Sequence, residues 1–471
     1  MSDKWLVLKF GGTSVAGRPQ WEAISALARG RRESGYRVLL VCSAVAGVTD
    51  LLTALSGQPE SPQLRKKLLD RHLALAAELG VEEDTWLAEA VQLVDRRLAR
   101  LAGADTPEHR AGLLSLGEWL STRIGQRFLA GQMHAGWVDA REALEAAPEP
   151  DLSESRQWLE ADCRPGKDPD LVHDWCNRPP VLVTQGFIAR MPGGSTALLG
   201  RGGSDTSAAL FAGRLEAERL EIWTDVPGLF SADPRLLENA RLLREVTYAE
   251  ALEMAAGGAK VVHPRCIRAA AETSTPVVIC DVSRPEFRGT VIGATASNGQ
   301  GIKTVPCKKS MAVMLLQNLD ARRQVGFLAA VFDVFRQRGI SVDQVATSET
   351  TTTVALDRAL NHLTEQEMRH LESDLSALCT VKSFADCVCV NLVGRGACTA
   401  LGRLQPMLAC FSEAPLLMAS QSANDLCLSL LVRHEDHERI LRAAHQALIP
   451  PPDLPGGDCF GETWQQWVAQ S

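Results

Sequence analysis

The sequence has no run of about 18 consecutive apolar residues, the length that a membrane-spanning helix needs. Its first residues, MSDKWLVLKF, contain only a short apolar stretch and no small-residue cleavage site, so no signal peptide is expected. We therefore expect a cytoplasmic protein that makes no use of a membrane.

The sequence also lacks any Cys-x-x-Cys pair, although it contains 13 cysteines. Their odd number and scattered positions are typical of reduced cytosolic thiols rather than of a disulfide framework. Cys387 and Cys389 are two apart in an apolar run, the spacing of neighbours on one face of a strand. We expect the closest histidine pair, His434 and His437, on an exposed polar face. No cysteine or third histidine completes a ligand set there, so no protein-held metal site is predicted.

Three common nucleotide-binding signatures are absent. There is no GxxxxGK[ST] phosphate loop, no GxGxxG after the first predicted strand, and no HRD or DFG set of a protein kinase. The net charge of −8 argues against nucleic acid as a partner. It also means that an anionic substrate needs locally gathered lysine and arginine.

A chain of 471 residues predicts two to four domains. Short unbroken apolar runs alternate with helical stretches, which favours a mainly parallel sheet sandwiched by helices, an α/β fold. Between about residues 60 and 135 apolar residues recur at helical spacing instead, which predicts an inserted helical layer. The predicted strands are residues 5–10, 38–44, 181–187, 220–225 and 276–282.

The pattern changes after residue 295. The polar, glycine-bearing stretch 296–310 is predicted to be a linker. Residues 325–356 are predicted to form helix, turn, strand, hairpin turn and strand, and residues 392–432 repeat that plan. The sequence therefore predicts a first domain over 1–295, two duplicated α+β modules over 311–385 and 386–450, and a tail over 451–471.

Glycine-rich turns follow several of the predicted strands. In KFGGTS, Lys9 ends the first strand, and Gly11 and Gly12 would let the backbone approach a phosphate without a Cβ in the way. A tight strand–helix turn with an incidental lysine would look the same. The stretch LLGRGGSDTSAAL has the same plan, with Arg201 among glycines and Ser204 or Asp205 available to cap the next helix.

Two further turns, IWTDVPGLFSADPR and AAGGAKVVHPR, again place cationic side chains in loops after strands or beside glycines. The carboxyl ends of parallel strands meet at one edge of a sheet, where helix N-termini present free N–H groups. Four glycine-bearing turns of this kind, each with a cationic side chain, are difficult to explain by turn chemistry alone. They predict a nucleotide site at this edge.

These residues resemble the amino-acid kinase family and, within it, the aspartokinases. The motifs are KFGGTSV, SAVAGVTDLL, SLGEWLST, GRGGSDTSAA, WTDVPGLFSADPR and GGAKVVHPR, in order along nearly the whole chain. VGFLAAVF and ISVDQVATSE are similar to the regulatory ACT (ferredoxin-like) modules of aspartokinases. SQSANDLCLSL and CFGETWQQW resemble the aspartokinase half of fused aspartokinase–diaminopimelate decarboxylase proteins.

The resemblance implies transfer of the ATP γ-phosphoryl group to the β-carboxylate of L-aspartate, with Mg²⁺. This is the first step of lysine, threonine and methionine biosynthesis. The catalytic residues would be Lys9 and Asp205. By resemblance, Arg201 would bind the α-carboxylate of aspartate and Glu118 would contact its α-amino group. The remaining substrate residues would be Ser43, Thr49, Gly202 and Ser204, and the ATP residues Lys9, Gly11, Gly12, Thr13, Ser14, Thr224, Asp225, Phe230, Asp233, Arg235 and Lys260.

Phe230 departs from the tyrosine often found in this family motif, which puts one ring-hydroxyl contact in doubt. The Thr in SDTSA also replaces a tyrosine of some members, a change beside the site.

The resemblance further implies feedback inhibition by lysine, threonine or both, in a homodimer or larger homo-oligomer joined through the ACT modules. Asp343 and Glu349 could meet an effector ammonium group, or could be solvated turn residues. The candidate effector residues are Gln324, Gly326, Phe327, Leu328, Val342, Asp343, Ser348 and Glu349. Two alternatives remain open: a kinase for another amino acid, such as glutamate or acetylglutamate, and a non-catalytic amino-acid sensor built on the kinase fold.

Overall fold

The computed structural model describes residues 4–81, 86–147, 149, 152–259, 261–296, 301–318, 325–397, 399–451 and 459–470. The chain divides into two compact units, each interrupted in sequence. The first comprises Met1–Gly228, Arg244–Tyr248 and Val261–Ala296; the second comprises Leu229–Leu243, Ala249–Lys260 and Ser297–Ser471. No helix among the described residues is long and apolar enough to cross a membrane.

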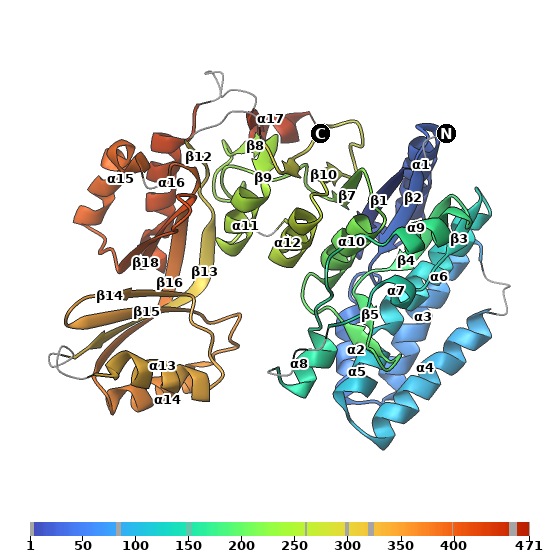
Figure 1. Cartoon of the computed structure of the whole chain (residues 1–471), viewed down its shortest axis with the longest axis horizontal. Helices are drawn as coiled ribbons and strands as arrows, with labels where there is room; N and C mark the ends of the chain where they lie inside the picture. The colour runs from blue at the N-terminus through green and yellow to red at the C-terminus, as the bar shows by residue number, and fades with distance from the viewer. Residues whose placement is uncertain are drawn as a thin grey trace. The chain divides into compact units, whose positions relative to one another are not determined.

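Within the described residues, an eight-stranded sheet forms the centre of the first unit, in the order β3-β4-β2-β1-β7-β10-β11-β9 (Figure 1). All neighbours pair in parallel except β10 and β11. The five predicted strands are confirmed to within about two residues, because their apolar runs are buried on both faces. The strands are β1 (Trp5–Phe10), β2 (Arg37–Cys42), β3 (Ala135–Trp137), β4 (Val181–Gln185), β7 (Arg219–Thr224), β9 (Glu245–Thr247), β10 (Val277–Asp281) and β11 (Val291–Gly293).

Helices cover this sheet, and those of the predicted helical layer share one hydrophobic core with β1 and β2. The periodic residues Leu68, His72, Leu75 and Leu79 of α3 are buried, as their spacing predicts. The helices are α1 (Arg18–Glu33), α2 (Val48–Gly57), α3 (Pro62–Leu79), α4 (Trp86–Gly103), α5 (Pro107–Leu114), α6 (Leu116–Ala130), α7 (Ala140–Ala143), α8 (Glu154–Leu159), α9 (Pro169–Cys176), α10 (Gly203–Arg214) and α12 (Pro264–Glu272). A small hairpin joins β5 (Ile188–Arg190) to β6 (Thr196–Leu198).

The second unit contains a seven-stranded antiparallel sheet within the described residues. Its strands are β12 (Gly301–Thr304), β13 (Cys307–Gln317), β14 (Gln344–Thr347), β15 (Thr351–Asp357), β16 (Thr380–Arg395), β17 (Met418–Gln421) and β18 (Cys427–Arg433). Its main helices are α13 (Phe327–Gln337), α14 (Glu365–Ser376), α15 (Gln405–Leu408) and α16 (His437–Leu448), and α11 (Tyr248–Ala256) contributes residues from Ala249 onward. The fold class predicted from sequence, a helix-covered parallel sheet followed by two α+β modules, is confirmed.

The two modules have separate hydrophobic cores, one with α13 and α14 and one with α16. Ile302 and Val305 belong to the core of α16, although they precede the first module in sequence. Most of the predicted linker is therefore structured: residues 301–304 form β12, and residues 307–310 begin β13. Strand β12 pairs with the distant β16, which no local pattern in the sequence indicates.

The described cysteines are free thiols. Cys387 and Cys389 are buried in β16, as their spacing predicts. The prediction of an exposed histidine pair is wrong for His437, whose residue is only 4% exposed, while His434 is exposed. Helix α16 begins at His437 and turns this ring inward. Within the described residues no group of three or more His, Cys, Asp or Glu side chains could hold a metal ion.

Candidate active site

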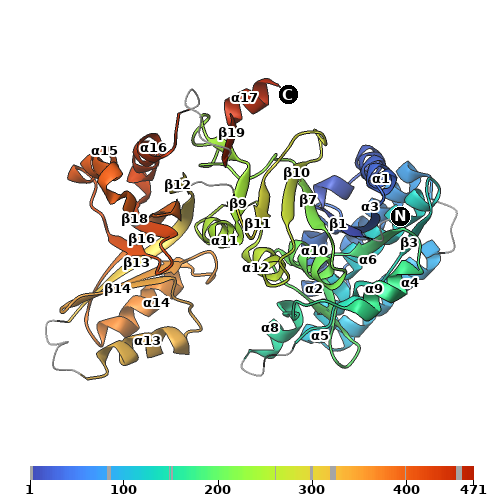
Figure 2. The same ribbon diagram turned by 45° about the horizontal axis from the view of Figure 1, so that its top comes forward.

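Strand β1 places Lys9 near the carboxyl end of the central sheet. Leu8 and Phe10 belong to the core on one face, so the alternation of the strand directs Lys9 to the other. Helix α10 packs on β1 and carries Asp205 in its first turn (Figures 1 and 2). The Lys9 Nζ lies 2.5 Å from the Asp205 Oδ1, and the two side chains are 14% and 15% exposed. The two predicted catalytic residues therefore form one ion pair.

The glycine turn after β1 approaches the loop after β2 closely. A Cβ on Gly12 would lie 2.7 Å from the carbonyl oxygen of Ala44, so this position requires glycine. A Cβ on Gly11 would meet only the Lys9 Nζ, at 3.9 Å. Thr13 and Ser14 follow in a short 3-10 turn, with Thr13 exposed and Ser14 buried. All these predicted phosphate residues lie beside Lys9.

Helix α6 holds the loop after β2 through two hydrogen bonds. The Ala44 N–H donates to the Glu118 Oε1 (3.1 Å), and the Ser121 hydroxyl donates to the Ser43 carbonyl (2.8 Å). Glu118 is buried, and this burial raises its pKa from 4.5 to about 8. Thr49 is exposed in the first turn of α2. The structure thus brings Glu118 and Ser43, two predicted substrate residues, to one loop.

The GRGG turn leads directly into α10. Gly202 is the N-cap residue, with φ of 66° in the left-handed region, and no side chain caps the helix. The prediction that Ser204 or Asp205 caps it is therefore wrong, because the Asp205 carboxylate pairs with Lys9 instead. Arg201 is exposed, and Ser204 lies against Gly186, where a Cβ would approach its Oγ to 2.7 Å.

His263 belongs to this region, although the sequence reasoning gave it no role. A Cβ on Gly202 would lie 2.3 Å from its Cγ, so the ring lies directly over the GRGG turn. The pKa of His263 is lowered by burial and by Arg265, then Arg201, while the Asp205 carboxylate acts in the opposite direction. The position of His263 immediately before Pro264 could have indicated a helix cap in the sequence, because a histidine Nδ1 can cap a helix that begins with proline.

The ends of β7 and β10 lie at the same sheet edge. Thr224, the last residue of β7, is the register partner of Asp281, the last residue of β10. The Thr224 hydroxyl donates to the Asp225 Oδ1 (3.1 Å). Asp281 is 1% exposed, and its Oδ1 accepts from both the N–H and the hydroxyl of Ser283. Asp281 was also missed, although an acid closing the apolar run PVVICD was a usable signal.

The other predicted ATP residues lie in the second unit or outside the described residues. Phe230, Asp233 and Arg235 occupy the segment Leu229–Leu243. The Asp233 Oδ1 accepts from the Arg235 N–H (2.9 Å), and the Arg235 side chain is 90% exposed. Lys260 lies outside the described residues.

The predicted effector residues lie at the start of α13 and at both ends of the β14–β15 hairpin. Gly326 is the N-cap of α13, followed by Phe327 and Leu328. Asp343 is already paired: Lys308 Nζ lies 2.6 Å from its Oδ1, and the Asp357 N–H donates to its Oδ2. An effector ammonium would have to compete with Lys308 for this carboxylate. Val342 is half-buried, Ser348 bonds across the β14–β15 turn, Glu349 is exposed, and Gln324 lies outside the described residues.

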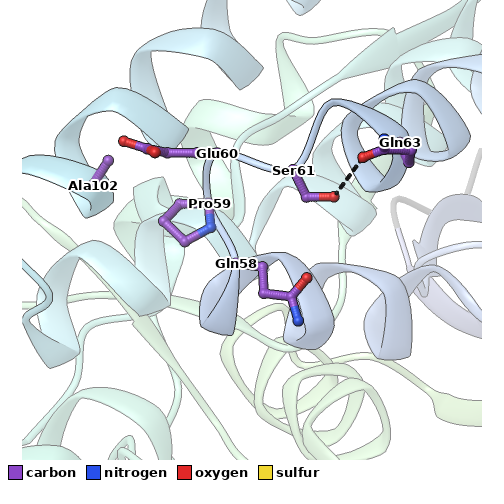
Figure 3. A pocket seen from close by; sticks show the side chains of 6 residues that line it. All are labelled: Gln58, Pro59, Glu60, Ser61, Gln63 and Ala102. Atoms are coloured by element: carbon purple, nitrogen blue, oxygen red, sulfur yellow. Dashed lines mark hydrogen bonds between the residues drawn. The ribbon is translucent and has the colours of Figure 1, made fainter.

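A surface depression of about 580 Å³ lies elsewhere in the first unit (Figure 3). Its one drawn hydrogen bond joins Ser61 to Gln63, at 3.4 Å. It contains none of the predicted site residues and no buried charged group, so it does not change the placement of the site. The lining residues are Gln58, Pro59, Glu60, Ser61, Gln63 and Ala102.

The comparisons with known proteins identify the family of the chain. The profile of the amino acid kinase family matches residues 4–281, more than half of the chain. The chain belongs to the amino acid kinase family. It is 31% identical over 458 residues to the lysine-sensitive aspartokinase 3 of Escherichia coli, covering 94% of this chain and 99% of that protein.

Solved structures extend the match to nearly the whole chain. Escherichia coli aspartokinase III in complex with aspartate and ADP (R-state) is 29% identical, with a TM-score of 0.78, and the match covers 95% of this chain and all of that one. Its complex with lysine and aspartate (T-state) matches with the same identity and TM-score. The expectation of an aspartokinase within the amino acid kinase family is confirmed. These relatives do not support the likeness to fused decarboxylase proteins.

Proposed function

We propose that this amino acid kinase transfers the γ-phosphoryl group of ATP to the β-carboxylate of L-aspartate, giving the acyl phosphate 4-phospho-aspartate. The aspartokinase relatives support the substrate, and the ADP complex of one of them supports the nucleotide. The observation that carries the proposal is the Lys9–Asp205 ion pair beside the glycine turn of β1.

The reaction needs charge neutralisation more than proton transfer. A carboxylate has a pKa near 4, so the aspartate side chain is already a nucleophile at pH 7. Two anions must meet, and phosphoryl transfer develops charge on the equatorial oxygens. The Lys9 ammonium and the N–H groups of the turn at Gly11 and Gly12 would stabilise that charge. No general base is therefore assigned.

Mg²⁺ is proposed as the partner of the nucleotide phosphates, and the residues present fit it. Mg²⁺ in nucleotide sites is held by one or two carboxylates together with substrate phosphates rather than by a protein cage. Asp205 offers such a carboxylate next to Lys9. When bound, the ion would screen the negative charge of the phosphates. Asp205 would also hold the Lys9 ammonium in place until the phosphate arrives.

Aspartate recognition is assigned to Arg201 and Glu118. Arg201 offers a planar fork to the α-carboxylate, which lysine cannot reproduce. Glu118, with its pKa near 8, is mostly protonated at pH 7 before substrate binds. An ammonium group placed beside it would favour the ionised form, so aspartate binding would release a proton. Ser43, Thr49, Gly202 and Ser204 would complete this part of the site.

A coupled assay of ADP release tests the proposal directly. Turnover with aspartate and little with glutamate or acetylglutamate is the expected result. Preferred turnover of another amino acid would identify a different member of the family. No turnover with any of them, together with a thermal shift by amino acids, would identify a non-catalytic sensor.

We further propose that the second unit is an amino-acid sensor that associates two or more copies of the chain through its ACT modules. Lysine, threonine or both are the proposed effectors, because one relative is lysine-sensitive and its structure contains lysine. A cytoplasmic location belongs to the same proposal. The likeness of the C-terminal half to fused decarboxylase proteins stays a prediction.

A further inference from the structure

The segment Leu229–Leu243, here called the nucleotide hairpin, carries Phe230 and two other residues proposed to bind ATP. Its two ends are joined: the Leu243 N–H donates to the Leu229 carbonyl, and the Ser231 N–H donates to the Arg241 carbonyl, each at 2.8 Å. Phe230 and Leu242 form an isolated antiparallel bridge between these bonds. The hairpin is therefore closed at its base, and its tip holds the exposed side chain of Arg235.

The C-terminal tail adds a further strand to this hairpin. Strand β19 (Phe460–Thr463) pairs antiparallel with β8 (Arg241–Leu243), the returning arm of the hairpin. The next two residues continue the contact. The Trp464 N–H donates to the Ala240 carbonyl (2.8 Å), and the Gln465 N–H donates to the Glu238 carbonyl (3.1 Å). Residues 460–465 thus bind the hairpin along its returning arm, from Glu238 to Leu243.

Arg241 is a buried residue of the hairpin whose side chain donates hydrogen bonds to the backbone of the tail. Its residue is only 6% exposed, and its guanidinium donates to the carbonyls of Phe460 and Gly461 at 3.4 and 3.3 Å. The same guanidinium reaches the carbonyls of Pro450 and Pro451, at 3.3 and 3.4 Å. A buried charge held by several backbone acceptors is costly to displace. The tail is therefore part of the folded unit.

Trp464 lies against Phe230, which departs from the tyrosine often found in the family motif. Its ring is 5.4 Å from the Phe230 ring, with an interplanar angle of 80°, an edge-to-face contact. Trp467 stacks on Trp464, with ring centroids 4.9 Å apart and an interplanar angle of 26°. Helix α17 (Trp464–Ala469) begins with a capping box between Thr463 and Gln466, which fixes the position of Trp464. Figure 2 shows β19 and α17 at the C-terminal end of the chain.

We infer that Trp464 is a positioning residue for ATP binding: its ring orients Phe230, and the tail braces the nucleotide hairpin. A tyrosine at position 230 could use its hydroxyl to fix the ring, whereas phenylalanine depends on packing alone. The edge of Trp464 supplies that packing. The inference rests on the proposed function, because it assumes that the hairpin binds ATP.

The test compares full-length variants in the coupled ADP-release assay. Because an aromatic pair contributes modestly, Trp464→Ala is expected to raise the KM for ATP by about three- to tenfold. The KM for aspartate should stay within about twofold, since its proposed site is in the first unit. Trp464→Phe should recover most of the ATP affinity. Val468→Ala, on the exposed side of α17, should change neither constant.

A double variant tests the route of the effect. The double variant carries both Phe230→Leu and Trp464→Ala. If Trp464 acts through Phe230, the ATP KM of the double variant should be no higher than the ATP KM of Phe230→Leu alone. A purely additive rise would overturn the inference, and so would equal rises in both KM values. If Trp464→Ala does not fold, Trp464→Leu takes its place.

Calorimetric titration with Mg·ATP separates this inference from the proposed function. Wild-type protein that binds ATP but turns over another amino acid would contradict the proposed substrate and leave the inference in force. Equal ATP affinity in the wild type and the folded Trp464 variant would overturn the inference alone. Absence of ATP binding in the wild type would overturn both.

Discussion

The Lys9 ammonium and the Asp205 carboxylate lie 2.5 Å apart, so the end of β1 and the start of α10 are joined by one shielded ion pair. The lysine is therefore held in position before a phosphate arrives. Incoming phosphate oxygens would share the ammonium with Asp205. This arrangement keeps a cation ready beside backbone N–H groups without leaving it unpaired.

Replacement of this lysine should stop catalysis with little change in fold. Lys9→Ala is expected to lower kcat by at least about a hundredfold, the usual effect of losing one preorganised donor. The coupled assay measures turnover, and circular dichroism checks folding. Lys4→Ala, at the exposed position immediately before the same strand, is the matched control and should retain turnover. Near-normal kcat in Lys9→Ala would remove Lys9 from the mechanism.

Replacement of Arg201, the arginine of the GRGG turn, should change the KM for aspartate much more than the KM for ATP. Arg201→Lys keeps the charge but loses the planar fork, so the aspartate KM should rise about tenfold, the value of one charge-assisted hydrogen bond. The ATP KM should change much less. Arg235→Lys, in the nucleotide hairpin, should show the reverse pattern. Equal changes in both constants for Arg201→Lys would count against its assignment.

Burial of Glu118 should make stability depend on pH. Its pKa is raised from 4.5 to about 8, so its contribution to stability is fully present below pH 4.5 and is lost as the pH rises toward 8. The loss would be on the order of 5 kcal/mol. Glu118→Gln should remove it, so its advantage over the wild type in urea unfolding should grow from pH 5 to pH 8. The exposed Glu89→Gln variant should follow the wild-type curve, and parallel curves for Glu118→Gln would contradict the burial argument.

The glycine pair after β1 offers a test of close packing. Gly12→Ala would place a Cβ 2.7 Å from the Ala44 carbonyl oxygen. The variant should therefore lose about 1–3 kcal/mol in the free energy of unfolding and melt at a lower temperature. Gly11→Ala meets only the end of the flexible Lys9 side chain and should melt near the wild-type temperature. Differential scanning calorimetry of the two variants decides this. Equal melting temperatures would show that the loop after β2 can move away.

Amino-acid binding to the second unit should appear as thermal stabilisation. Lysine or threonine is expected to raise the melting temperature, because a ligand that binds only the folded state stabilises it by mass action. Methionine serves as the comparison. If none of the three shifts the melting temperature, the second unit would be an association module without an effector.

Much of the first unit could be predicted because its signals are local. The apolar runs of β1, β2, β4, β7 and β10 are unbroken, as expected for strands buried on both faces. The glycine turns at Gly12 and Gly202 are recognisable from their own motifs, although the groups that a Cβ would meet there, the Ala44 carbonyl and the His263 ring, come from elsewhere in the chain. The family resemblance then supplied the roles that the pattern alone left open.

The errors concern contacts between residues far apart in sequence. Asp205 has the sequence features of a helix cap, but the nearby ammonium of Lys9, almost 200 residues earlier, takes its carboxylate. Residues 301–304 are polar and glycine-bearing, yet they form a strand because β16 provides its partner. Likewise, no local pattern indicates that Trp464 meets Phe230.

Strand β16 belongs to both modules of the second unit. Its first residues pair with the end of β13 in one module, as Thr380 does with Gln317. Its later residues pair with β18 in the other, as Val390 does with Leu430. A shift of β16 along its axis would change its hydrogen-bond register with β13 in one module and with β18 in the other at the same time. We therefore expect the two modules to respond to a bound molecule together rather than as separate receptors.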